Sequence, residues 1–127
     1  MRYLHWFFVI AFGANGLSML LFPETWFNTI PGVTATGPFN AHFVRDVGAA
    51  YLVCGLAFGW LLRTPHAWPA AVGGCLFLLV HAAIHVAEFW VGTQSFGHLL
   101  GDVPAVLVLP AVALWSAWPR ARGRTHD

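Results

Sequence analysis

The sequence predicts an all-α protein, a bundle of four transmembrane helices. Hydrophobic residues make up 58% of the 127 residues and charged residues only 9%, whereas about 25% of residues are charged in an ordinary soluble domain. The mean hydropathy is +0.68, and the chain contains seven Trp and eleven Phe. A single core of this size cannot hide so much apolar surface from water. We therefore expect a multi-pass protein embedded in the lipid bilayer.

Four apolar segments have the length that a helical span requires. A helix crosses a hydrocarbon layer of about 30 Å with about 20 residues. Helices satisfy their own backbone hydrogen bonds in lipid, and no period-2 alternation indicates a membrane β-barrel. Pro, Gly or Arg residues end the segments, as is typical of helix termini. The predicted spans cover residues 4–22, 43–62, 68–91 and 98–118.

The arginines predict the orientation of these spans. Four crossings place both chain ends and the short turn at residues 63–66 on one side of the membrane. Because cytoplasmic loops carry an excess of Arg and Lys, this side is predicted to be the cytoplasm. Only Arg45 lies toward the other side. The arginines on the predicted cytoplasmic side are Arg2, Arg63, Arg120, Arg122 and Arg124.

The remaining composition limits the domain organisation and the partners. We expect one transmembrane domain over residues 1–118 and a disordered cytoplasmic tail over residues 119–127. The apolar N-terminal stretch is as long as a full span, so it is predicted to be a retained first helix. The formal net charge of +1 provides no basic field, which argues against nucleic-acid binding. Cys54 and Cys75 lie in apolar runs without a partner at metal-ligand spacing, which predicts packing roles.

Ionisable residues in the spans carry the main functional information, because each is costly in lipid. Three of the five carboxylates lie in spans, and all three lie toward the predicted outer boundary. Four histidines have the same distribution. The carboxylates are Asp46, Glu88 and Asp102, and the histidines are His42, His81, His85 and His98.

Helical spacing predicts that these side chains converge. At about 100° per residue, His81, His85 and Glu88 fall within an arc of about 60° on one helix face. His98 and Asp102 are one helical turn apart, and His42 and Asp46 have the same spacing if their helix begins slightly early. Three helices can therefore direct polar groups into a shaft that opens outward.

A transition metal would neutralise this cluster in one step. Three carboxylates bring three potential negative charges, and Arg45 returns one positive charge, so two negatives remain in a medium that penalises unpaired ions. Imidazole and carboxylate ligands suit Zn, Fe, Mn or Cu, and helical bundles build such sites from facing helices. The predicted ligands are His81, His85, Glu88, His98 and Asp102. The residues predicted to surround them are His42, Arg45 and Asp46.

Two alternatives stay open at the sequence level. In the first, the protein is a non-enzymatic accessory or structural subunit of a larger membrane complex, or a homo-oligomer, and Arg45 pairs with Asp46 or Glu88 in a buried ion-pair or proton-relay network. In the second, it carries haem or a quinone. His81 and His85 share one stripe, so they cannot clamp the same haem iron from opposite faces, and one of them would need a partner on another helix. Nothing in the sequence selects an enzymatic reaction.

The stretch Asn40-Ala41-His42-Phe43-Val44-Arg45-Asp46-Val47-Gly48, followed by an apolar helix, resembles small four-span bacterial inner-membrane proteins of DoxX-like appearance. The resemblance covers the first half of the chain and does not extend to the stripe of His81, His85 and Glu88. It implies a four-helix inner-membrane fold and carries no site residues to this chain. Function must be argued from the site itself.

Overall fold

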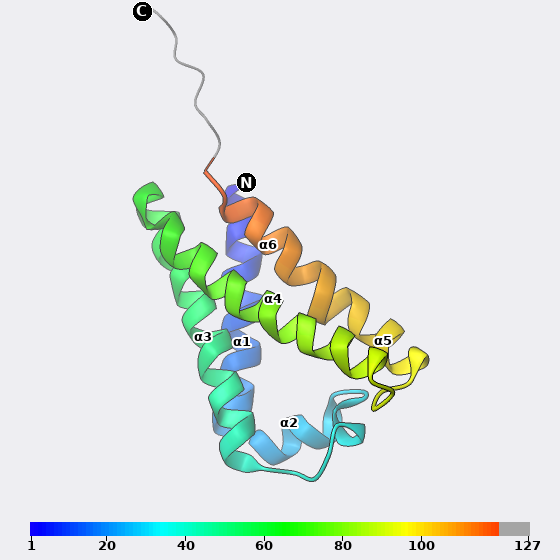
Figure 1. Ribbon diagram of the computed structural model, residues 1–127. Helices are drawn as coiled ribbons and strands as arrows, with labels where there is room; N and C mark the ends of the chain where they lie inside the picture. The colour runs from blue at the N-terminus through cyan, green and yellow to red at the C-terminus, as the bar shows by residue number, and fades with distance from the viewer. Residues whose placement is uncertain (120–127) are drawn as a thin grey trace, which may run out of the picture.

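The computed structural model describes residues 1–119, and this part of the chain is helical and contains no strand (Figure 1). Four helices or helical runs are long and apolar enough to cross a membrane, which confirms the predicted spans. The predicted tail, apart from Pro119, lies outside the described residues. The α-helices are α1 (Arg2–Leu21), α2 (Pro23–Thr29), α3 (Ala41–Arg63), α4 (Trp68–Trp90), α5 (Phe96–Asp102) and α6 (Leu109–Ala117). Short 3₁₀ turns η1 (Val33–Ala35) and η2 (Pro65–Ala67) and a π-helical segment η3 (Val103–Val108) complete the described chain.

The helix ends follow from local chemistry. Pro23 ends α1 and begins α2 at a position where its missing N–H costs nothing. The side chain of Asn40 accepts hydrogen bonds from the backbone N–H groups of His42 and Phe43, at 3.0 and 3.1 Å, and this cap starts α3 two residues before the predicted span. Ser95 caps α5 by accepting from the backbone N–H of His98. Each predicted span is therefore present with ends displaced by a few residues.

Glycines bring α1 and α3 into close contact, and these two helices share the most extensive interface of the bundle. A Cβ atom added at Gly16 would lie 2.6 Å from the carbonyl oxygen of Gly48, and one added at Gly55 would lie 2.8 Å from the backbone nitrogen of Gly13. In lipid, such close backbone approach supplies the van der Waals packing that holds helices together. Gly59, which follows Gly55 at the spacing of a Gly-x-x-x-Gly pair, is not at this tight approach.

The main core occupies the half of the bundle that contains the start of α1 and the end of α6. α3 packs on α4, and α4 packs on α6. The largest buried side chains here are Phe8, Phe12 and Phe58, whose rings pack against one another. Cys54 and Cys75 are buried in the same core as free thiols, which agrees with their predicted packing roles.

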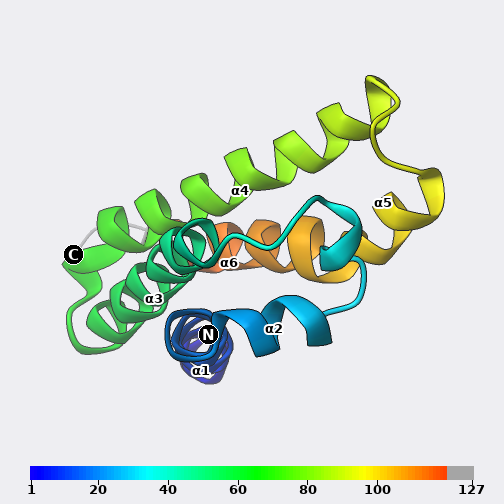
Figure 2. The same cartoon turned by 90° about the horizontal axis from the view of Figure 1, so that it is seen from below.

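The other half of the bundle is more open and is bridged by α2. The start of α1 and the end of α6 lie at one end of the molecule (Figure 1), where Nε2 of His5 lies 3.0 Å from the carbonyl oxygen of Ser116. At the opposite end, α2 and the loop after it extend from α1 toward α5 (Figure 2). Phe27 anchors α2 in a small second core with Met19 and Val44. The first loop therefore folds back onto the bundle.

Candidate functional site

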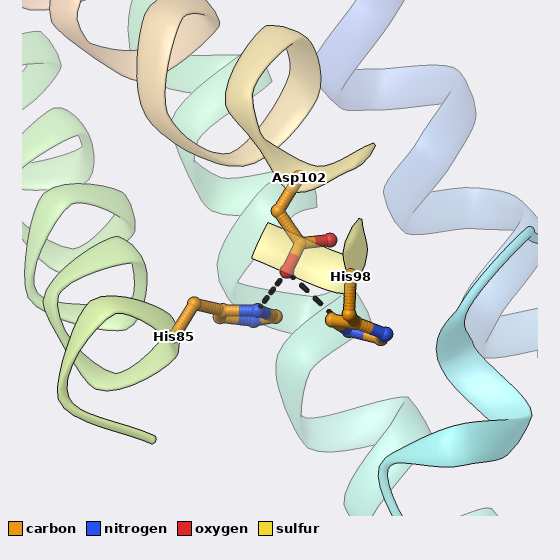
Figure 3. Close-up of side chains that lie close together, drawn as sticks. All are labelled: His85, His98 and Asp102. Atoms are coloured by element: carbon orange, nitrogen blue, oxygen red, sulfur yellow. Dashed lines mark hydrogen bonds and ion pairs between the residues drawn. The ribbon is translucent and has the colours of Figure 1, made fainter. Parts of the chain in front are cut away.

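Three of the predicted ligands converge where α4 meets α5. His85 points from α4 toward Asp102 and His98 of α5 (Figure 3). Nδ1 of His85 lies 2.7 Å from Oδ2 of Asp102, and Nε2 of His98 lies 3.4 Å from the same oxygen. Only 11–15% of the surface of each of these side chains is exposed. One potential ligand atom from each lies within 4.8 Å of the others, so this group is compact enough to hold a metal ion.

Local structure positions the two residues of α5. The Ser95 cap starts the helix, and the four-residue spacing then places His98 and Asp102 one turn apart on the same face. Directly after Asp102 the backbone widens into the π-helical segment η3, with Pro104 near its start. Pro104 cannot donate a backbone hydrogen bond, so the regular α pattern is interrupted at this point. π-Helical segments are rare and are frequent at functional sites.

His81 extends the cluster along α4. Its Nε2 atom lies 3.3 Å from Nε2 of His85, and the two rings meet edge to face with centroids 4.8 Å apart. His85 therefore lies between His81 on one side and Asp102 on the other. The four side chains form a continuous row, His81–His85–Asp102–His98, that links α4 to α5.

This row lines one wall of a cavity of about 640 Å³. Such a volume lies within the range of small-molecule sites in proteins. The other walls come from α1, α2, α3 and η3, and they are mostly apolar. Exposed residues of the segment 30–40 also line the cavity, so it reaches the surface at the α2 end of the bundle. The predicted shaft of polar groups from three helices is found only in part, because the polar row comes from α4 and α5, and His42, Asp46 and Glu88 do not line this cavity.

Asn15 of α1 and Trp26 of α2 are joined by a hydrogen bond in the wall of the cavity. Nε1 of Trp26 donates a hydrogen bond of 2.9 Å to Oδ1 of Asn15, and both residues line the cavity. Asn15 therefore bonds to a residue outside its own helix and also lines the cavity. Its partner lies in the folded-back helix α2 and not in another span.

The loop after α2 contacts the cluster directly. Gly32 has a positive φ of 86°, and a Cβ atom added there would lie 3.0 Å from Cε1 of His98. The imidazole of His98 therefore lies close to the backbone of this loop, at a place where an added Cβ would require the ring to shift. Sequence reasoning missed this contact, because a Pro-Gly pair such as Pro31-Gly32 is typical of a turn but does not say what the turn packs against.

The remaining predicted ligand, Glu88, is not part of this compact group. Its Oε2 atom accepts a hydrogen bond of 3.3 Å from Nε2 of Gln94, a residue of the turn between α4 and α5. Glu88 shares the helical stripe with His81 and His85, but it lies at the end of α4, where the turn supplies the nearest polar partner.

The three residues predicted to surround the site lie at the start of α3. His42 and Asp46 form an ion pair of 3.4 Å, with 89% and 64% of their side chains exposed. Nε of Arg45 donates to the carbonyl oxygen of Leu20 at 3.2 Å, so it caps the end of α1. Among residues 1–119, no ion pair joins Arg45 to Asp46 or Glu88. The ion pair of Arg45 that the buried-network alternative predicted is therefore not formed.

No protein-family model, curated protein or solved structure matches this chain. The resemblance to DoxX-like proteins therefore stays a prediction. The cluster and its cavity are the features of the molecule that bear on function.

Proposed function

We propose that this chain is an integral protein of the bacterial inner membrane that binds a divalent transition metal through His85, His98 and Asp102. The single observation that carries the proposal is the convergence of two imidazoles and one carboxylate, all largely buried, on the wall of an open cavity. Ionisable groups at membrane depth are costly and are by default functional. A bound cation offsets the charge that Asp102 brings into the bundle.

The donor set indicates the class of metal. Two imidazoles with one carboxylate suit Zn, Fe, Mn or Cu. Ca and Mg prefer oxygen ligands, so this donor set argues against them. With metal–ligand bonds of about 2.0–2.1 Å, two ligands of a tetrahedral ion lie about 3.3–3.4 Å apart. The distance of 3.4 Å between His98 and Asp102 fits this value. The 2.7 Å between His85 and Asp102 is that of a hydrogen bond, and the donor atoms of the group span up to 4.8 Å. The histidine side chains must therefore adjust as metal replaces the proton of His85.

His81 supports this arrangement by orienting His85. If Nδ1 of His85 binds the metal, its ring proton resides on Nε2, which faces Nε2 of His81 at 3.3 Å. Such outer hydrogen bonds fix the tautomer of a metal-bound histidine. Three protein ligands leave at least one coordination position for a molecule in the cavity, which is the arrangement of catalytic sites more than of structural ones.

The proposed location is the outer half of the membrane. Arg2 begins α1 and Arg63 ends α3, at the end of the bundle where α6 also ends, and the positive-inside rule assigns that end to the cytoplasm. The cluster lies toward the opposite end, so its cavity faces the periplasmic side in this orientation.

Metal content of the purified protein tests the proposal. We expect near-stoichiometric Zn, Fe, Mn or Cu by elemental analysis of protein purified in detergent without a histidine tag. His85→Ala should abolish this content, whereas His66→Ala, which removes an exposed histidine near the opposite end, should leave it unchanged. Full metal retention in His85→Ala, with normal membrane insertion, would refute the assignment.

A second candidate function is proton relay in an accessory subunit of a larger membrane complex. The continuous row from His81 to His98 favours it, because neighbouring imidazoles and a carboxylate at 2.7–3.4 Å pass protons readily. This function predicts no stoichiometric metal and copurification with other subunits in mild detergent. A haem or quinone carrier, the third candidate, predicts visible absorption or an extractable quinone.

A further inference from the structure

The cavity beside the cluster is far larger than a metal ion or a proton path needs. Its volume is about 640 Å³, and its walls outside the cluster are formed largely by apolar and aromatic side chains such as Phe12, Met19, Val47 and Tyr51. A cavity of this size and lining suits an organic molecule with an apolar body. Because it reaches the surface at the loop 30–40, such a molecule can enter at the membrane boundary.

Most polar groups of the cavity wall outside the cluster are already bonded to protein. Asn15 accepts from Trp26 through Oδ1, and its amide nitrogen lies 3.7 Å from Sδ of Met19. The Asn40 side chain caps α3, and the Thr36 hydroxyl donates to the carbonyl oxygen of Val33. The row from His81 to His98, together with the hydroxyl group of Tyr51, is therefore where a ligand's polar end can gain hydrogen bonds.

Without a bound metal, the row offers mainly hydrogen-bond acceptors to a ligand. A carboxylate oxygen only accepts, so Nδ1 of His85 donates to Oδ2 of Asp102 at 2.7 Å, whereas Nε2 of His98 lies 3.4 Å from the same oxygen, at ion-pair distance. Nε2 of His85 is then an acceptor, and His81 donates to it. The lone pairs that remain are those of Nδ1 of His81 and Oδ1 of Asp102, and the imidazole of His98 adds one acceptor nitrogen. The row therefore has acceptors to spare.

We propose that the cavity binds a membrane-soluble amphiphile with a neutral hydroxyl head, a long-chain alcohol or an alkyl phenol, whose O–H donates to this row. An anionic head would meet the negative charge of Asp102, and a cationic head would lose more hydration on entering the apolar cavity than a neutral one. The inference uses the same cluster as the proposed function but does not require a bound metal. When a metal is bound, the oxygen of the same hydroxyl suits its open coordination position.

Photo-crosslinking with competition tests this inference. The probe is 4-dodecylphenol that carries a diazirine in its alkyl chain, and the protein is chelator-treated and reconstituted in lipid nanodiscs. We expect crosslinks at cavity residues on α1 and α3, among them Val47, and not at lipid-facing Val53, which is 61% exposed on the same helix. Unlabelled 4-dodecylphenol should compete at least about 10-fold better than dodecylbenzene, because only the phenol donates a hydrogen bond.

Two variants make the result specific to the cavity. Val47→Trp fills the cavity and should abolish the crosslinks, whereas Val53→Trp, the same change on the outer face of α3, should preserve them. The inference is overturned if crosslinks spread evenly over lipid-facing residues, if dodecylbenzene competes as well as the phenol, or if dodecylammonium competes better. The competition on the unmodified chain keeps the test decisive even if Val47→Trp does not fold. Because the protein is metal-free here, absence of metal in elemental analysis refutes only the proposed function.

Discussion

Asp102→Asn is the sharpest test of the cluster, because it removes the negative charge and keeps the shape of the side chain. Two imidazoles contact the same carboxylate oxygen, at 2.7 and 3.4 Å. A bound metal replaces the ring proton that His85 shares with Asp102, so the loss of metal affinity comes from the anionic ligand that the metal contacts directly. Removing a group that only supports the ligands of a metal costs about 10–100-fold in affinity. We therefore expect Asp102→Asn to weaken metal binding by at least about 10-fold.

The chain provides a matched control for this variant. His42 and Asp46 have the same four-residue spacing and the same 3.4 Å separation as His98 and Asp102, but they are exposed. Exposed ion pairs contribute about 0–1 kcal/mol, so we expect Asp46→Asn to change metal affinity by less than about fivefold. The measurement is a competition titration of Zn²⁺ against a chromophoric chelator, with both variants and the unmodified protein in the same detergent.

Two outcomes would refute the reasoning. Unchanged affinity in Asp102→Asn, with unchanged helical circular dichroism and gel-filtration volume, would show that the carboxylate does not support metal binding. Equal losses in Asp102→Asn and Asp46→Asn would show that the metal responds to the overall negative charge of this end and not to the buried row.

Two glycine substitutions test how the bundle supports the site. Gly32→Ala should lower the melting temperature and weaken metal binding, because the new Cβ would lie 3.0 Å from the ring of His98. Gly92 also has a positive φ but has open space around it, so Gly92→Ala should lower the melting temperature without weakening metal binding. Gly16→Ala should destabilise the bundle by about 1–3 kcal/mol through overpacking against α3, as measured by denaturant titration in detergent. The same change at Gly73, which has open space, should stabilise α4 by about 0.5–1 kcal/mol; equal effects at both positions would contradict the close α1–α3 approach.

The spans and the short-range pairs could be predicted from the sequence, because both depend on distances along the chain. A span needs a fixed apolar length, and residues four apart on a helix meet whatever surrounds them. Both His-x-x-x-Asp pairs, that of His42 with Asp46 and that of His98 with Asp102, therefore form as the spacing predicts.

Tertiary structure decided which of these pairs belongs to the site. Spacing fixes the angle between residues on one helix, but helix packing fixes the rotation of that helix toward its neighbours. The start of α3 turns His42 and Asp46 outward, whereas α5 turns His98 and Asp102 onto α4. Glu88 lies on the predicted stripe and still pairs with the turn that follows it.

The cavity likewise could not be predicted from the sequence, because it arises between elements that are far apart in the chain. α2 folds back across the open end of the bundle, and the loop after it brings Gly32 onto His98. Hydropathy and spacing describe each segment separately and carry no information on the space between segments. The sequence by itself therefore determined a helical membrane protein with intramembrane histidines and carboxylates. Only packing determined that His81, His85, Asp102 and His98 meet in a row beside a cavity large enough for a ligand.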